Sequence, residues 1–138
     1  MSNLDKIKEY YVNNSPFAQL LGIEVVDLKQ GYAKTKMELT NNHNNSIGIT
    51  HGGAIFTLVD VTFGVAAISH GFAAVTTNAS ISYINPGIDG PLTAEAVELS
   101  SSKKLCMYEV KVTNSKGILI ASAQGTMYKK KDPYPPVK

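Results

Sequence analysis

The chain has 138 residues, of which 43% are hydrophobic and 17% are charged, and its formal net charge is +2. This length suits one domain with its own hydrophobic core, and the composition excludes an intrinsically disordered chain. The small net charge, and the absence of a dense basic face interleaved with aromatic residues, argue against binding to nucleic acid.

The single cysteine, Cys106, excludes an internal disulfide and favours a cytoplasmic protein. The N-terminus has no apolar signal core behind a basic start. The longest apolar stretch, residues 54–68, is interrupted by polar residues and is shorter than the ~20 residues that span a bilayer. We therefore expect a cytoplasmic chain that does not associate with membranes.

Two short helices are predicted at the N-terminus. A cap at Ser2 or Asn3, followed by apolar residues at helical spacing, predicts a helix that ends at Asn13-Asn14. Ser15 caps the second helix, and Pro16 occupies its first position, where a backbone N–H has no intrahelical partner.

Two strands and an unusual helix follow. Residues 23–28 are mainly apolar with an imperfect period of two. Residues 33–39 alternate between apolar and polar side chains, which is typical of a strand with one buried face. Residues 41–50 form an Asn-rich loop without periodicity. Ala54–Ser69 predicts a helix that is apolar almost all round, and such a helix is buried.

The rest of the chain is predicted to consist of strands at residues 75–84, 92–99, 105–113 and 118–128, separated by turn residues. The basic, Pro-rich residues 129–138 are expected to form a flexible tail of one domain that covers residues 1–138. Strands on both sides of one buried helix predict an α+β protein, with a curved antiparallel sheet wrapped around one long central helix.

Asp60 is the most informative single residue, because it lies in the middle of this apolar helix. An ionised carboxylate that leaves water must be paired or hydrogen-bonded, so such a residue is retained for structure or for chemistry. The structural alternative is that Asp60 lies on a wet stripe of the helix together with Thr57.

His51-Gly52-Gly53 stands where this helix begins. The first N–H groups of a helix have no intrahelical acceptor, and the dipole is positive there, so a carbonyl oxygen that becomes negative during acyl transfer is stabilised. The alternative is a tight turn with His51 on the surface. Asn45, in the preceding loop, either orients a substrate carbonyl or water, or is a loop-forming residue.

The spacing between Gly52 and Asp60 sets a geometric limit. Eight residues of helix span about 12 Å, so one helix cannot easily bring both groups to the same carbonyl. Either the two act separately or a second subunit supplies one of them, and we favour the second subunit.

Other chemistry finds little support. His43, His51 and His70 lack metal-ligand spacing, and no phosphate-binding glycine loop or nucleophile elbow occurs. Cys106 alternates with apolar strand residues and is expected to be a buried wall residue rather than a nucleophile. No metal site is predicted.

The run from Asn45 to Asp60 has the pattern Asn-x5-His-Gly-Gly-x6-Asp and resembles the signature of hotdog-fold acyl-CoA thioesterases of the phenylacetate-degradation type. Supporting similarity lies at Gly22-Ile23, Ile81–Pro86 and Gly117–Gly125. The resemblance extends from about Phe17 to about Lys130.

The resemblance implies a hotdog fold in which two subunits pair edge to edge into a continuous sheet and dimers associate into a homotetramer. Two equivalent sites lie at each dimer interface. Asn45, His51 and Gly52 come from one subunit and Asp60 from the other, in agreement with the distance along the helix.

In this family the Gly52-type N–H binds the thioester oxygen, and the Asn45-type amide and His51-type imidazole organise the carbonyl end. The Asp60-type carboxylate acts as general base or nucleophile, and both roles stay open. CoA belongs to the substrate, and no cofactor is expected. The implied substrate-binding residues are Gly53, Thr76, Thr77, Asn78, Tyr83, Ser102, Lys103 and Lys104.

Among these residues, Thr76 and Thr77 compete for the position that orients water, while Asn78 and Tyr83 are expected to line the substrate channel. Ser102, Lys103 and Lys104 lie where related enzymes contact the CoA nucleotide. Lys129 and Lys130 are secondary candidates for the phosphates, with plain solvated lysines as the alternative. The chain has no arginine, so lysine point charges must bind them.

Two other functions compete with thioester hydrolysis. A hotdog hydratase or dehydratase usually carries a His-Phe-Pro loop or an Asp-x4-His motif, and neither occurs here. A non-catalytic acyl-CoA-binding protein usually lacks the acidic helix residue, whereas Asp60 is present.

Overall fold

A computed structural model of the chain describes residues 1–137. The elements follow in the order α1 (Asn3–Asn13), α2 (Pro16–Leu20), β1 (Ile23–Lys29), β2 (Tyr32–Met37), the 3-10 helix η1 (Asn41–His43), α3 (Gly52–Ile68), β3 (Phe72–Tyr83), β4 (Leu92–Ser101), β5 (Leu105–Thr113) and β6 (Leu119–Pro133). The predicted elements are present, with boundaries that differ by a few residues.

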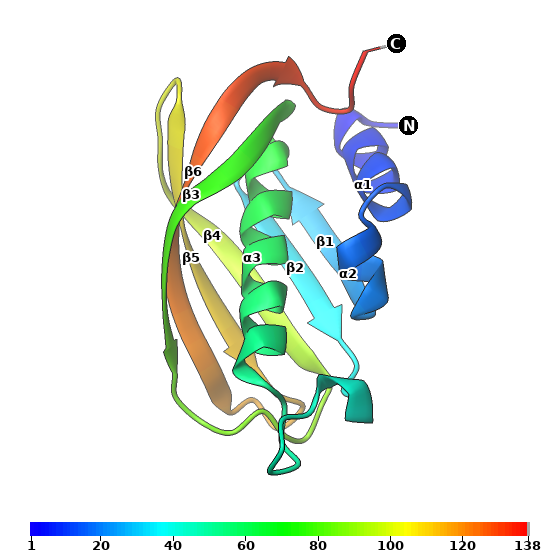
Figure 1. The fold of residues 1–138 in the computed structure, drawn as a ribbon. Helices are drawn as coiled ribbons and strands as arrows, with labels where there is room; N and C mark the ends of the chain where they lie inside the picture. The colour runs from blue at the N-terminus through cyan, green and yellow to red at the C-terminus, as the bar shows by residue number, and fades with distance from the viewer. Residues whose placement is uncertain (138) are drawn as a thin grey trace.

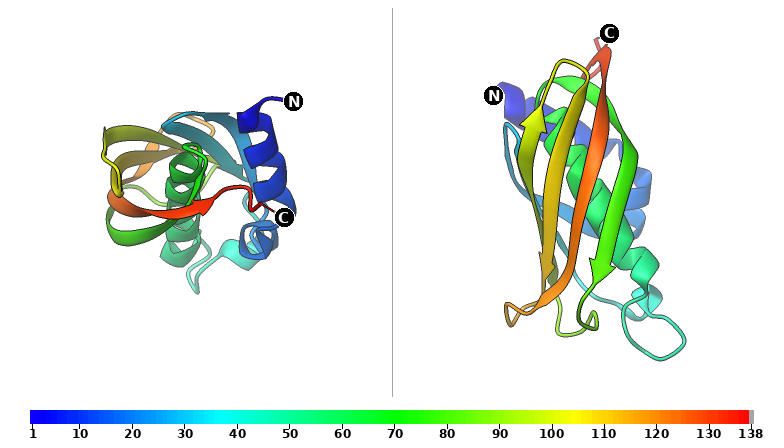
Figure 2. Two further views of the ribbon diagram at one scale, coloured as in Figure 1. Left: turned by 90° about the horizontal axis from the view of Figure 1, so that it is seen from above. Right: turned by 90° about the vertical axis from the view of Figure 1, so that its left-hand side faces the viewer.

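The six strands form one sheet in the order β1-β2-β4-β5-β6-β3, and every neighbouring pair is antiparallel. The sheet curls so that α3 lies in its concave face, while α1 and α2 stand beside β1 (Figure 1). The view from above shows α3 enclosed between the strands and the N-terminal helices (Figure 2). The predicted α+β hotdog fold is therefore confirmed.

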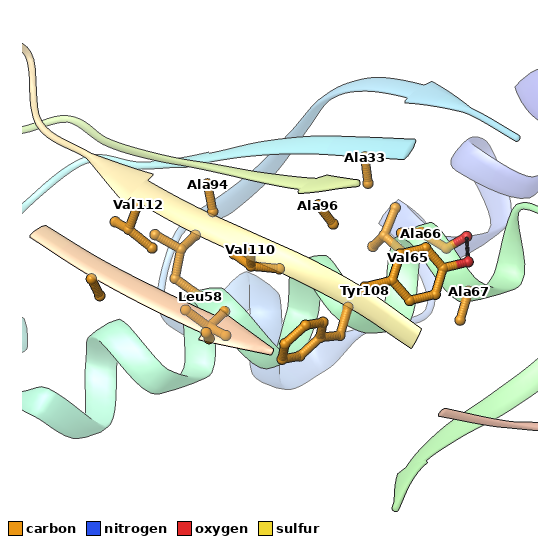
Figure 3. Close-up of a cluster of buried hydrophobic side chains, with 14 of the residues drawn as sticks. Ala33, Leu58, Val65, Ala66, Ala67, Ala94, Ala96, Tyr108, Val110 and Val112 are labelled. Atoms are coloured by element: carbon orange, nitrogen blue, oxygen red, sulfur yellow. Dashed lines mark hydrogen bonds between the residues drawn. The ribbon is translucent and has the colours of Figure 1, made fainter. Parts of the chain in front are cut away.

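The core lies between α3 and the sheet. Leu58, Val65 and Ala67 of α3 are buried, and small residues such as Ala94 and Ala96 on β4 let the helix approach the strands closely (Figure 3). Complete burial of a branched aliphatic side chain stabilises the fold by ~1.5–3 kcal/mol. This apolar packing fixes the rotation of α3, and so it fixes which residues face away from the sheet.

The first helix begins with the predicted cap. Ser2 Oγ accepts a hydrogen bond from the Asp5 N–H at 3.1 Å, and the Asp5 carboxylate accepts one from the Ser2 N–H at 3.2 Å. Ile7 points into the core and is 2% exposed. The amphipathic character of α1 thus attaches it to the rest of the fold.

The expected flexible tail is wrong for residues 129–133, which form the end of β6. Lys129 pairs with Ala74 and Pro133 with Phe72, so backbone bonds to the start of β3 order this basic segment. Tyr134 continues the packing, since its ring meets Tyr10 of α1 edge to face at 5.3 Å. Lys138, the last residue of the predicted tail, lies outside the described residues.

Among residues 1–137, no helix is long and apolar enough to cross a membrane.

Candidate active site

The N-terminal end of α3 is built around His51. Its Nδ1 accepts a hydrogen bond from the Gly53 N–H at 2.7 Å, so the imidazole caps the helix. Because Nδ1 is the acceptor, the proton of the neutral ring is on Nε2, which is left to donate. A Cβ on residue 53 would lie 3.0 Å from Nδ1, so the cap itself explains glycine at this position.

Gly52 makes no such contact with the capping imidazole. Its φ is not in the left-handed region, and a Cβ would only touch the Tyr83 ring at 3.4 Å. Tyr83 also donates from its hydroxyl to the Gly52 carbonyl at 3.2 Å. Within residues 1–137 no acceptor bonds the Gly52 N–H, as is usual for the first helical position.

Asn45 closes the loop before α3 and faces the same cleft as Gly52. Its carboxamide oxygen accepts from the N–H groups of Ile47 at 3.0 Å and Ile49 at 3.3 Å, so the loop-forming role is real. No acceptor for its Nδ2 group is found in the described part of the chain, which leaves that amide as a donor. A cleft of about 380 Å³ brings Asn45, Gly52 and Tyr83 together.

Asp60 is exposed in a single chain, on the stripe of α3 that is turned away from the buried core. Thr57 and Gly64 lie on the same stripe and are half-buried. The wet-stripe alternative therefore describes one chain correctly, and one subunit pays no penalty for burying this carboxylate. Whether Asp60 serves chemistry depends on what surrounds it.

The hydroxyl of Thr76 donates to Asp60 Oδ1 at 2.8 Å, whereas the hydroxyl of Thr77 donates to the Thr126 carbonyl at 3.1 Å. The β3–β6 register shifts between Thr76 and Asn78, and such an irregularity decides which of two adjacent residues faces the helix. Asn78 itself lies exposed on β3. Of the two competing threonines, Thr76 is the one beside Asp60.

Tyr11 of α1 approaches the same carboxylate and was not among the predicted site residues. Burial raises the pKa of Tyr11, and the negative charge of Asp60 raises it further. Nothing local in the sequence indicates that these two residues are near one another, because they are 49 positions apart. The surroundings of Asp60 therefore involve β3 through Thr76, and Tyr11 of α1 interacts with the carboxylate electrostatically.

The predicted phosphate-binding lysines lie together at the opposite end of the molecule from the Gly52 cleft. A second cleft of about 370 Å³ is bordered by Lys103, Lys104, Lys129 and Lys130, together with Lys131, which was not predicted. The remaining lining residues are His70, Phe72 and Tyr128.

Two serines shape the neighbouring β4–β5 turn. The Ser102 hydroxyl donates to the Leu105 carbonyl and accepts from the Leu105 N–H, both at 3.2 Å, so Ser102 holds the turn. Ser101 accepts from Lys129 Nζ at 2.8 Å, which connects the turn to β6. These bonds hold the turn and β6 side by side, and the lysine cleft lies between them.

A polar cluster of His70, Glu98 and Tyr108 lies near this second cleft and was not predicted from the sequence. Glu98 Oε1 lies 2.6 Å from His70 Nε2 and accepts from the Tyr108 hydroxyl at 2.9 Å. Burial, reinforced by the Glu98 carboxylate, strongly raises the pKa of Tyr108. These groups satisfy one another and form a structural network.

Cys106, next to this network, is fully buried, and burial raises the pKa of its thiol, as suits the predicted wall residue. Within residues 1–137 no group of three or more His, Cys, Asp or Glu side chains is placed to bind a metal ion.

Comparisons with known proteins agree on one family. Residues 47–121 match the family model described as thioesterase superfamily. The chain is 37% identical over 134 residues to a putative esterase of Archaeoglobus fulgidus, an alignment that covers 96% of this chain and 87% of the relative.

The second relative has both a known sequence and a solved structure. The chain is 31% identical over 117 residues to the acyl-coenzyme A thioesterase PaaI of Escherichia coli, with 84% of each chain covered. The structure of the E. coli PaaI protein from the phenylacetic acid degradation operon superposes with a TM-score of 0.91 at 27% identity, and covers 94% of this chain and 95% of that chain.

A solved structure of a Streptococcus mutans protein bound to acetyl CoA is also similar. It has a TM-score of 0.75 at 32% identity, and the match covers 79% of this chain and 89% of that chain.

Proposed function

Because the chain belongs to the thioesterase superfamily, we propose that it hydrolyses the thioester of an acyl-CoA to the free acid and CoA, with Asp60 as the catalytic carboxylate. The observation that carries the proposal is the exposed Asp60 carboxylate, oriented by the Thr76 hydroxyl at 2.8 Å. The names of the E. coli relative and the acetyl-CoA-bound neighbour support this substrate class.

In the proposed reaction with Asp60 as general base, the carboxylate takes a proton from a water molecule as the water oxygen adds to the thioester carbon. The C–S bond then breaks, and the proton passes to the leaving sulfur, which gives the free acid and the CoA thiol. The Gly52 N–H receives the carbonyl oxygen as it becomes negative, and one such donor can be worth ~3–4 kcal/mol in the transition state. The free amide of Asn45 and the Nε2–H of His51 supply further donors to the carbonyl end.

A complete site requires two chains. Within one chain, Gly52 lies beside Tyr83 and Asp60 beside Thr76, and these β3 residues are about 23 Å apart along the strand. β3 is at the edge of the sheet, so a second copy can pair with it in antiparallel fashion. A two-fold axis near Ala79 and Ser80 then sets Gly52 of the partner subunit near Asp60.

This geometry supports the proposed homodimer, and we propose further that two dimers associate into a homotetramer. A glycine at position 52 is consistent with a shared site, because neither φ nor packing within one chain requires it. Close approach of a ligand to the backbone does require the absence of a side chain.

The lysine cleft is the proposed site for the CoA phosphates. Lys103, Lys104, Lys129 and Lys130, joined by Lys131, concentrate positive charge around one opening. Lysines bind phosphate as point charges without the paired geometry of arginine, so binding depends on ionic strength.

The single buried thiol, Cys106, is in keeping with a cytoplasmic place of action.

The test is release of free thiol from acyl-CoAs by the purified protein. Asp60→Asn keeps the size of the side chain and lowers kcat about 10³-fold, the scale of a lost general base. The matched control is Asp27→Asn on β1, whose ion pair with Lys29 at 3.7 Å is exposed, and this variant keeps the wild-type rate.

Wild-type turnover in Asp60→Asn would remove Asp60 from the mechanism. A wild-type protein that binds acyl-CoA without releasing thiol would instead be the non-catalytic binding protein. A single turnover in ¹⁸O-labelled water separates the two roles of Asp60, since a nucleophilic carboxylate acquires ¹⁸O and a general base does not.

A further inference from the structure

Gly64 has no structural explanation within the chain. It lies in the interior of α3, where glycine is among the least favourable residues. Its φ is not in the left-handed region, and within residues 1–137 a Cβ at this position would meet no heavy atom within 4 Å other than its two chain neighbours and the adjacent backbone of α3 itself. Gly125 shows the contrast, because a Cβ there would lie 2.8 Å from the Phe63 ring.

The open space at Gly64 lies next to the proposed catalytic residue, Asp60. Residues four apart on a helix are neighbours on one face, about 6 Å apart along the axis. Gly64 therefore adjoins the carboxylate at which the thioester carbon is proposed to react. A side chain at residue 64 would project into the space beside that carbon.

Two arms extend from the thioester, the acyl group and CoA, and their different chemistry indicates which surface each one contacts. The CoA arm ends in phosphates and is drawn to the lysine cleft. His70, which borders that cleft, turns toward Glu98 of β4, so the cleft lies toward the sheet side of α3. Gly64 lies on the opposite stripe, which it shares with Asp60.

The surroundings of Gly64 suit the acyl arm. Asp60 is the only ionisable residue of α3, and the half-buried Val61 follows it on the helix. Tyr11 of α1 packs against the core and lies close enough for the charge of Asp60 to raise its pKa. An uncharged hydrocarbon or aromatic group matches such walls better than the amides of the pantetheine arm do.

We propose that Gly64 is a specificity-determining residue, which keeps open the part of the acyl pocket that takes a bulky or extended acyl group. This inference rests on the proposed thioesterase function. Glycine at 64 gives up helix stability to maintain that space. A larger residue restores stability and closes the space.

The experiment compares Gly64→Ala and Gly64→Val with the wild type on acetyl-, hexanoyl-, decanoyl- and phenylacetyl-CoA. Gly64→Val lowers kcat/KM at least tenfold for decanoyl- and phenylacetyl-CoA and leaves acetyl-CoA within about twofold, and Gly64→Ala has a smaller effect in the same order. Gly64→Ala also raises Tm by about 3–5 °C, because alanine is the better helix former.

The control is Thr57→Val, which changes the same stripe on the other side of Asp60 and leaves the ratio of rates between long and short acyl groups unchanged. An equal loss for all four substrates would place the pantetheine arm over Gly64. A changed oligomer size by light scattering would place a partner chain there, and unaltered selectivity would remove any role for Gly64. Each of these three results overturns the inference. Failure of the proposed function looks different, since the wild type then releases no thiol from any substrate.

Discussion

The polar groups at the two ends of α3 differ in whether they have hydrogen-bond partners within the chain. At the C-terminal end, His70 and Tyr108 both bond to the Glu98 carboxylate, at 2.6 and 2.9 Å. At the N-terminal end and along the outer stripe, the Gly52 N–H has no acceptor in the described chain and Asp60 is exposed. Polar groups that are hydrogen-bonded to one another stabilise the fold, whereas polar groups without a partner in the chain are available to a ligand. The sharpest tests alter one end and ask whether the other responds.

Apart from the loss of Asp60 itself, the largest effect is expected from removal of the Gly52 N–H. Gly52 is the first residue of α3, where proline fits, and His51 has φ −63° and ψ 139°, a conformation allowed before proline. Gly52→Pro should lower kcat about 10²–10³-fold while the far-ultraviolet circular dichroism is retained. Gly52→Ala keeps the N–H and is the matched control; if both variants lose activity equally, bulk rather than the lost donor is the cause.

The second prediction concerns the hydrogen-bonded groups at the C-terminal end of α3. Glu98→Gln weakens the hydrogen bonds that the Glu98 carboxylate makes to His70 and Tyr108. Because the Glu98 side chain is only 24% exposed, this change should lower the free energy of unfolding by about 2 kcal/mol in a urea titration. The kcat on acyl-CoA should stay within about twofold of the wild type. Glu24→Gln, in an exposed ion pair with Lys36 at 3.7 Å, should leave stability unchanged. A loss of turnover without a loss of stability would show that the network takes part in the reaction.

A smaller effect is expected from the group that orients Asp60. Thr76→Val preserves shape and removes the hydroxyl that donates at 2.8 Å, so kcat should fall about tenfold, equivalent to ~1.4 kcal/mol, with little change in KM. Thr77→Val removes a bond to the Thr126 carbonyl and should have less effect on kcat. The reverse order in steady-state kinetics would contradict the assignment of Thr76.

The smallest effect is expected at the lysine cleft. A Lys103→Ala/Lys104→Ala double variant should raise KM about fivefold at low ionic strength, and the difference should shrink as salt is added. Lys34→Ala/Lys36→Ala on β2 removes the same charge elsewhere and serves as the control. Equal KM values for the two double variants would show that only net charge matters.

Much of the site is readable from the sequence because it is local. Asn45, His51, Gly52 and Asp60 lie within one loop and one helix, and their order along the chain sets their spacing. The capping role of His51 is harder to foresee, since a free imidazole and a capping imidazole have the same sequence pattern. Only the 2.7 Å bond to the Gly53 N–H distinguishes them.

Other features depend on contacts between distant segments. The choice between Thr76 and Thr77 depends on a register shift against β6, and periodicity cannot reveal which of two identical neighbours turns inward. The cluster of His70, Glu98 and Tyr108 joins α3 to β4 and β5. The basic end of β6 has the composition of a tail, yet pairing with the start of β3 makes it a strand.

The periodicity of apolar residues and the helix caps thus determine that this chain forms one apolar helix among antiparallel strands, with an acid and two glycines at known places along it. Tertiary packing decides the rest: the rotation of α3, the strand residue that faces Asp60 and the polar groups that are satisfied. The physical reason is that periodicity reports the average environment of each residue. A hydrogen bond between distant segments depends on angstrom-scale placement that only the packed core imposes.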